Sequence, residues 1–231
     1  MTLSASIGSL PGRVGVVGPG LMGLGIAQAF AAAGVNVALC ARDEEAARRG
    51  RESLAASLAR QVARGRIDAA AETDLLARVE VNAATRGLSD CAMVVESVRE
   101  DRALKMAILA RIERAAPRAL LATNTSGLPV GGLAKALADP SRFLGLHFFS
   151  PAERMPLVEV VRGPETSTAT VETALRVVRS IGKSPVMVRD GPGFFATRST
   201  STVVLRPTLI VSLIIPAVGF PATLTTSKLC R

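Results

Sequence analysis

Short apolar runs recur along the chain up to about residue 188, and each has the length of a buried β-strand. Runs of this kind need a covered surface on both faces, as in the interior of a parallel sheet. They occupy residues 13–17, 35–39, 92–95, 119–122, 143–149, 157–161 and 185–188.

Segments with helical periodicity separate several of these runs. Their apolar side chains recur three or four positions apart, which places them on one face of a helix. The predicted helices cover residues 21–33, a segment that begins after Asp43, a segment capped by Asp101, and residues 168–181. Strands alternating with helices of this length predict an α/β fold, a Rossmann-type doubly wound and mostly parallel sheet.

The composition excludes several classes of protein. With 231 residues, 48% of them hydrophobic, the chain can bury a large core and is not a disordered linker. The three cysteines lack zinc-like spacing and are an odd number, so we expect neither a metal site nor a disulfide scaffold. The first residues lack the charged segment of a signal peptide, and we therefore expect a cytoplasmic protein.

The net charge of +9 raises the question of nucleic acid, which we do not expect as a partner. The chain has no Trp or Tyr for base stacking, and its arginines are spread along polar helix faces. The same charge suits a small anionic ligand that carries phosphates.

A G-x-G-x-x-G motif lies between the first predicted strand and the first predicted helix. In a strand–turn–helix context these glycines permit a tight turn, a close approach of a pyrophosphate, and helix–strand packing. The helix that follows would direct its unpaired N–H groups at the phosphates. A plain glycine-rich turn is the alternative, but the context favours a dinucleotide site at Gly18, Pro19, Gly20, Leu21, Met22 and Gly23.

The acidic residue that usually follows this motif is absent at the end of the second strand. An acid there binds the hydroxyls of the adenine ribose. Here the strand ends at Ala41, which accepts no hydrogen bond from its side chain, and Arg42 follows. Arg42 could pair with a 2′-phosphate, so NADP is possible beside NAD, although Asp43 and Glu44 lie close by.

His147 is the chain's single histidine, and Glu159 stands twelve residues later inside an apolar run. A lone histidine is more often structural than catalytic, but a buried carboxylate needs a partner. A His147–Glu159 pair would satisfy both groups, fix the tautomer of the imidazole and make it a base for an alcohol.

Five motifs in order make the chain similar to the NAD-binding domain of 3-hydroxyacyl-CoA dehydrogenases, over about residues 13–198. Ser150, the sequence at 127–129 and the sequence at 195–198 look most like the dehydrogenase part of multifunctional fatty-acid oxidation enzymes. The motifs are the glycine-rich segment 18–27, Asn124-Thr125-Ser126, His147-Phe148-Phe149-Ser150-Pro151, Met155-Pro156-Leu157-Val158-Glu159-Val160 and Asp190-Gly191-Pro192-Gly193-Phe194.

The resemblance implies an oxidoreductase that interconverts (S)-3-hydroxyacyl-CoA and 3-oxoacyl-CoA, in fatty-acid β-oxidation or related metabolism. It implies that His147 takes the 3-hydroxyl proton and that Glu159 orients it. By the same match, Ser126 would bind the substrate oxygen or the nicotinamide ribose, and Ser150 would help to hold the pair.

Four further residues match family positions that bind the two ligands. Glu100 and Lys105 match positions near the cofactor, and Ser57 and Arg64 match positions that contact coenzyme A. Taken without the resemblance, Glu100 and Arg64 would be solvated helix residues.

The last part of the chain departs from the family pattern. The family continues into a helical domain that covers the acyl-CoA cleft and forms the dimer, whereas residues 199–231 lack a helical pattern. We predict a dinucleotide-binding domain over residues 12–198 and an irregular tail over 199–231, and interpret the tail as a truncation or a reading-frame change. Homo-oligomerisation therefore stays open, and the alternative function is an inactive dinucleotide-binding module.

The tail also contains the one candidate for a membrane span, the uncharged stretch at 208–225. Pro216 and Pro221 interrupt it, and proline disrupts a helix interior. We therefore do not expect a membrane protein.

Overall fold

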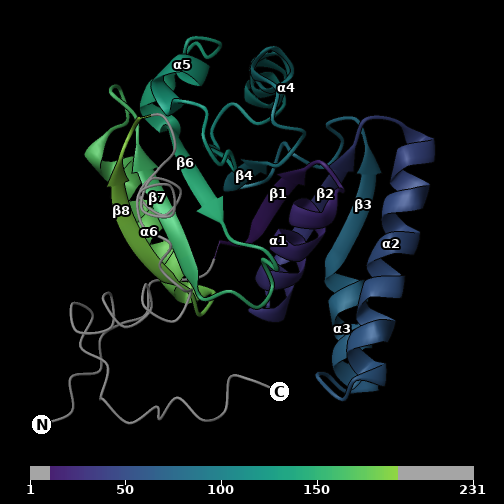
Figure 1. The fold of residues 1–231 in the computed structure, drawn as a ribbon. Coiled ribbons are helices and arrows are strands. Elements are labelled where there is room, and N and C mark those ends of the chain that lie inside the picture. The colour runs from purple at the N-terminus through teal and green to yellow at the C-terminus, as the bar shows by residue number, and fades with distance from the viewer. Residues whose placement is uncertain (1–10, 192–231) are drawn as a thin grey trace, which may run out of the picture. The chain divides into compact units, whose positions relative to one another are not determined.

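The seven apolar runs form seven of the eight strands of one sheet in a computed structural model, which describes residues 11–191 (Figure 1). The strands are β1 (Arg13–Val17), β2 (Asn36–Ala41), β3 (Val79–Ala83), β4 (Met93–Glu96), β5 (Leu120–Thr123), β6 (Phe143–Phe148), β7 (Leu157–Arg162) and β8 (Ser184–Arg189). The helices are α1 (Leu21–Ala32), α2 (Glu44–Ala63), α3 (Ala69–Arg78), α4 (Arg102–Ala115), α5 (Val130–Ala134) and α6 (Thr168–Ser180), with a 3₁₀ turn at Pro140–Arg142.

The strand order is β3-β2-β1-β4-β5-β6-β7-β8, and every neighbouring pair is parallel except β6 and β7. The predicted Rossmann-type, mostly parallel sheet is therefore confirmed. The strand order reverses between β1 and β4, because β2 and β3 follow β1 toward one edge of the sheet and β4 begins the series toward the other edge. Ligands of such sheets bind outside the carboxyl ends of the strands at this point.

Two apolar clusters cover the two faces of the sheet. One contains Ile26 and Phe30 of α1, together with side chains from α2, α3 and α6. The other contains Leu109 of α4 and Leu133 of α5. Because successive strand residues point to opposite faces, Val16 belongs to the first cluster and its neighbour Val17 to the second.

Side-chain caps fix where most helices begin. Asp43 accepts a hydrogen bond from the Ala46 N–H at the start of α2, and Asp101 does the same for Leu104 at α4, as predicted. Helix α5 has no cap of its own, and the Asp190 carboxylate accepts from two of its N–H groups at 2.7 and 2.8 Å. The acid of the Asp190 motif thus joins the end of β8 to the start of α5.

Three elements were not predicted from the pattern: α3, β3 and α5. The predicted boundaries of the other strands and helices agree with the structure to within about two residues. Within residues 11–191, no helix is long and apolar enough to cross a membrane. Residues 192–231 lie outside the described part, and with them the predicted domain boundary at 198, the tail and the candidate span.

Candidate functional site

The glycine-rich turn after β1 is shaped for a phosphate group. Gly18 has a φ of +111°, and a Cβ there would stand 2.6 Å from the Ser97 carbonyl oxygen. A Cβ on Gly23 would overlap the Gly18 carbonyl oxygen, whereas a Cβ on Gly20 would meet no atom within 4 Å. Gly18 and Gly23 therefore allow the close packing of the turn, and the open space lies at Gly20.

The N-terminus of α1 has no side-chain cap and no acidic residue in its first turn. Helices α2, α3, α4 and α6 each have an Asp or Ser cap, and Asp190 supplies one to α5. Uncapped N–H groups at a helix N-terminus, beside open space at Gly20, fit a dinucleotide pyrophosphate.

The end of β2 carries the position at which the ribose acid was missing. Ala41 is buried, and the Arg42 side chain is 80% exposed with its Nε 2.9 Å from Asp43 Oδ2. Asp43 also accepts from the Ala46 N–H, and these two bonds lower its pKa. The structure thus leaves Arg42 accessible to a ligand, beside a carboxylate that partly balances its charge.

A cleft of about 450 Å³ opens at the carboxyl ends of β1, β4, β5 and β6. It brings together residues from four segments that the sequence separates by up to 130 positions. Its lining includes seven of the predicted site residues: Gly20, Leu21, Met22, Glu100, Ser126, His147 and Ser150. The other lining residues are Ser97, Val98, Arg99, Asn124, Phe148 and Phe149.

His147 and Glu159 form the predicted pair. They stand directly opposite each other in the antiparallel β6–β7 register, and His147 Nδ1 lies 2.7 Å from Glu159 Oε2. Both are buried, with the Glu159 side chain 2% exposed. A directly opposed pair on adjacent strands brings its side chains into contact, so the fold itself holds the imidazole on its carboxylate. The Phe149 ring lies 4.5 Å from the imidazole, centroid to centroid.

Asn124 is a cleft residue that the sequence analysis quoted in a motif without giving it a role. Its Nδ2 donates to Ser97 Oγ at 3.2 Å, and its Oδ1 accepts from the Phe148 N–H at 2.9 Å. The Asn124 side chain therefore ties the loop after β4 to the strand that carries His147. A polar residue at the end of a buried strand was the signal for this role.

Glu100 lies on the cleft wall and holds the segment that contains Ser126. Its Oε1 accepts from the Ser126 N–H at 3.0 Å and from the Gly127 N–H at 3.2 Å. Burial opposes ionisation of Glu100, but the hydrogen bond from Thr125, the charge of Lys105 and these N–H groups together lower its pKa. Lys105, the other residue expected near the cofactor, is fully buried.

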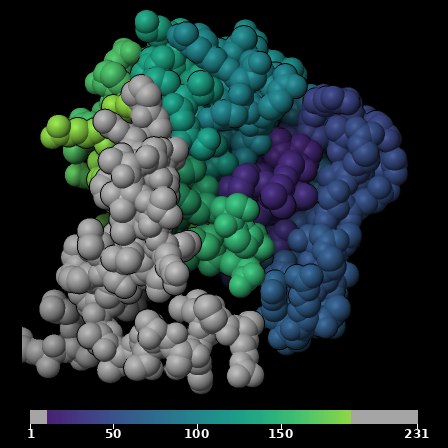
Figure 2. Space-filling view, in the orientation of Figure 1, coloured from purple at the N-terminus to yellow at the C-terminus, as the bar shows by residue number. Residues whose placement is uncertain are grey.

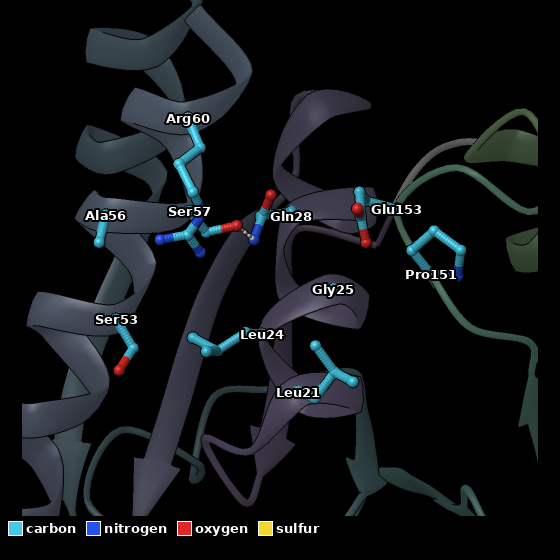
Figure 3. A pocket seen from close by; sticks show the side chains of 10 residues that line it. All are labelled: Leu21, Leu24, Gly25, Gln28, Ser53, Ala56, Ser57, Arg60, Pro151 and Glu153. Atoms are coloured by element: carbon cyan, nitrogen blue, oxygen red, sulfur yellow. Dashed lines mark hydrogen bonds between the residues drawn. The ribbon is translucent and has the colours of Figure 1, made fainter. Parts of the chain in front are cut away.

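A second pocket of about 240 Å³ lies between α1 and α2 (Figure 3). Ser57 and Arg60 enter it from α2, and Gln28 lies opposite on α1, with its Nε2 3.4 Å from Ser57 Oγ. Glu153, from the segment between β6 and β7, also lines the pocket and lies beside α1 near Gly25. Ser57 thus lines a pocket, and its contact with coenzyme A stays a prediction.

Arg64 is the C-cap residue of α2 and is exposed, outside the lining of this pocket. The arginine that does line it is Arg60, one turn closer to Ser57, which the sequence analysis missed. Its position three residues after Ser57 was the available signal, because residues three apart share a helix face.

The two pockets adjoin at one residue. Leu21, which is 78% exposed, lines both the cleft of His147 and the pocket of Ser57. In Figure 2 the purple surface at the start of the domain lies between the blue surface of α2 and the green surface of the segment after β6. An elongated ligand can therefore extend from His147 past Leu21 to the groove between α1 and α2.

Comparisons with solved structures return several dehydrogenases of acyl-CoA compounds. The chain is 30% identical to an (S)-3-hydroxybutyryl-CoA dehydrogenase of Ralstonia eutropha, with a TM-score of 0.77 over 90% of this chain and 78% of that one. It is 32% identical to FadB2 of M. tuberculosis, with a TM-score of 0.77 over 92% and 80% of the two chains. It is also 32% identical to the dehydrogenase part of multifunctional enzyme 1 of C. elegans, with a TM-score of 0.72 over 81% and 45%.

The family comparison agrees with the geometry. The model of the 3-hydroxyacyl-CoA dehydrogenase, NAD binding domain, matches residues 13–191, which is nearly the whole described part of the chain. The glycine-rich turn, the uncapped α1 and the cleft at the strand ends all fit NAD. The chain therefore belongs to the 3-hydroxyacyl-CoA dehydrogenase family and carries its NAD-binding domain.

Proposed function

We propose that this protein interconverts (S)-3-hydroxyacyl-CoA and 3-oxoacyl-CoA, in fatty-acid β-oxidation or a related metabolism. The observation that carries the proposal is the buried His147–Glu159 pair, which lies at the same cleft as the glycine-rich turn. A base held on a carboxylate beside a nicotinamide site is what the oxidation of an alcohol requires.

In the oxidative direction, His147 accepts the proton of the 3-hydroxyl as the bond between carbon 3 and its hydrogen breaks. With Nδ1 engaged by Glu159, Nε2 is the nitrogen that exchanges this proton. Glu159 stabilises the positive charge that His147 gains. The nicotinamide, when bound, supplies the acceptor for the hydride that leaves carbon 3. Ser126 and Ser150, on the wall of the same cleft, are placed to hold the substrate oxygen.

The coenzyme A part of the substrate is assigned to the pocket between α1 and α2. Ser57 and Arg60 line it, and Arg64 follows one turn later on α2. Cationic and hydroxyl side chains on one helix face suit the phosphates and amides of this ligand. Leu21, shared by both pockets, marks the path between the thioester end and the coenzyme A end.

The test is the reduction of acetoacetyl-CoA by NADH, followed as the loss of NADH absorbance, with free acetoacetate as the matched control. The chain should first be shown to bind NADH by fluorescence titration. We expect turnover with acetoacetyl-CoA and at least a hundredfold lower kcat/KM with acetoacetate, which lacks the part bound by the second pocket. Saturable NADH binding without turnover of acetoacetyl-CoA would contradict the proposal and support the inactive dinucleotide-binding module.

A further inference from the structure

Lys105, in the first turn of α4, has no exposed surface to offer a ligand. Its Nζ lies 2.9 and 3.1 Å from the two carboxylate oxygens of Glu96 and 3.2 Å from the Val98 carbonyl oxygen, both of which it can bind as a donor. The nearest Glu100 oxygen, Oε2, is 3.4 Å away. Lys105 therefore does not line the cleft itself, but it contacts Val98 and Glu100, which do.

Glu96 is the last residue of β4, and its side chain is also fully buried. Its Oε2 accepts from Thr123 Oγ1 at 2.6 Å, at the end of the neighbouring strand, and its Oε1 accepts from the Val98 N–H at 2.6 Å. A buried carboxylate is costly without a cation, so Glu96 and Lys105 depend on each other. The pair fixes the chain just below the cleft.

The same network continues to the cleft surface through Glu100. Lys105 Nζ faces Glu100 Oε2. The other carboxylate oxygen of Glu100, Oε1, accepts hydrogen bonds from Thr125 Oγ1 and from the N–H groups of Ser126 and Gly127. The Glu100 side chain is 39% exposed and lines the cleft, so it is the member that reaches solvent. Glu100 thereby links the loop after β4, which Lys105 contacts, to the loop after β5.

We propose that Glu96 and Lys105 are positioning residues for the cofactor. Their buried ion pair holds Glu100, and through Glu100 the Ser126–Gly127 segment, in the geometry that binds the nicotinamide end of NAD. The inference rests on the NAD site of the proposed function. It assigns Lys105 an indirect role and gives Glu96, which none of the sequence motifs singled out as a site residue, a direct part in that network.

The test is the Kd of NADH for the full chain, measured by fluorescence titration at a temperature where thermal unfolding shows each variant to be folded. Lys105→Met keeps the length of the side chain and removes its charge. We expect the Kd to rise at least tenfold, because Glu100 loses its cation. The matched control is Lys135→Met, an exposed lysine at the end of α5, for which the Kd should not change.

The double variant Glu96→Gln/Lys105→Met separates positioning from stability. It leaves no unpaired buried charge, so we expect its Tm to recover most of what Lys105→Met loses. Its Kd for NADH should stay at least tenfold above the wild-type value, since Glu100 remains without Lys105. This variant also keeps the test open if Lys105→Met alone does not fold.

A double-mutant cycle then tests whether Lys105 acts through Glu100. In the Glu100→Gln background, Lys105→Met should change the Kd by less than twofold. A folded Lys105→Met variant with a Kd within twofold of wild type would overturn the inference. It would also be overturned if the fold-changes in Kd caused by Lys105→Met and Glu100→Gln multiplied in the double variant, because the two residues would then act independently. These readouts need no turnover, so an inactive wild type that binds NADH would contradict the proposed reaction and leave this inference intact.

Discussion

Glu159→Gln is the substitution that most directly separates the chemistry of the site from its fold. The carboxylate contacts His147 Nδ1 at 2.7 Å, and it is buried at the centre of β7. Glutamine has nearly the same volume and can still accept a hydrogen bond from Nδ1, so the strand packing is preserved. Glutamine lacks the negative charge that stabilises a protonated, positively charged His147.

The size of the effect has as its upper limit the loss of one charge-assisted hydrogen bond, because glutamine keeps a neutral hydrogen bond to Nδ1. A charge-assisted bond contributes about 1.5–3 kcal/mol. Since about 1.36 kcal/mol in the barrier corresponds to a tenfold change in rate, kcat should fall about 5- to 150-fold. The KM for acetoacetyl-CoA and the Kd of NADH should change little, because Glu159 itself lines neither pocket.

The assay is the reduction of acetoacetyl-CoA by NADH, with the Tm measured in parallel. Glu165→Gln, an exposed glutamate shortly after β7, is the matched control and should keep the wild-type kcat. A kcat of Glu159→Gln within twofold of wild type would refute the role of the carboxylate. A large rise in the Kd of NADH would show instead that Glu159 acts on the cofactor site.

Three further outcomes follow from the structure. Gly20→Ala should keep the wild-type Tm but weaken NADH binding at least tenfold, because its methyl group enters the open space at the turn. Gly23→Ala should weaken NADH binding and also lower the Tm, because its methyl group would overlap the Gly18 carbonyl oxygen. Thermal unfolding and NADH titration check both variants. Arg42→Ala should weaken the binding of NADPH and leave that of NADH unchanged, since the 2′-phosphate alone needs the guanidinium; parallel titrations check this. The pKa of Glu100 is lowered from 4.5, so its contribution to the free energy of unfolding is present above pH 4.5 and is lost as the pH falls through the folded pKa. Urea unfolding across this range should show a shallower acid-side decline for Glu100→Gln, and an unchanged pH profile would contradict this assignment.

The fold was predictable wherever a strand or helix is marked by its own residues. The apolar runs of β1 and β4 are buried on both faces, so their sequences are continuous. Strand β3 was missed because it is an edge strand with polar residues Glu80 and Asn82 at alternate positions. Helix α3 was missed because only Leu75 of its side chains is buried.

The candidate site was predictable where two groups require each other. A carboxylate inside an apolar run needs a polar partner, and the single histidine, His147, is the partner of Glu159. Arg60 and Asn124 were missed because their roles depend on which elements meet in space, such as α1 with α2 or β5 with β6. The burial of Lys105 could not be predicted from the sequence either, because it depends on the packing of α4 over the end of β4.

We propose above all that His147 is the acid–base group of an NAD-dependent acyl-CoA oxidoreductase. The most direct measurement compares NADH oxidation by acetoacetyl-CoA for the wild type and for His147→Asn, after both are shown to bind NADH with the same Kd. We expect turnover by the wild type and a kcat at least a hundredfold lower for the variant. Equal turnover by the two proteins would contradict it.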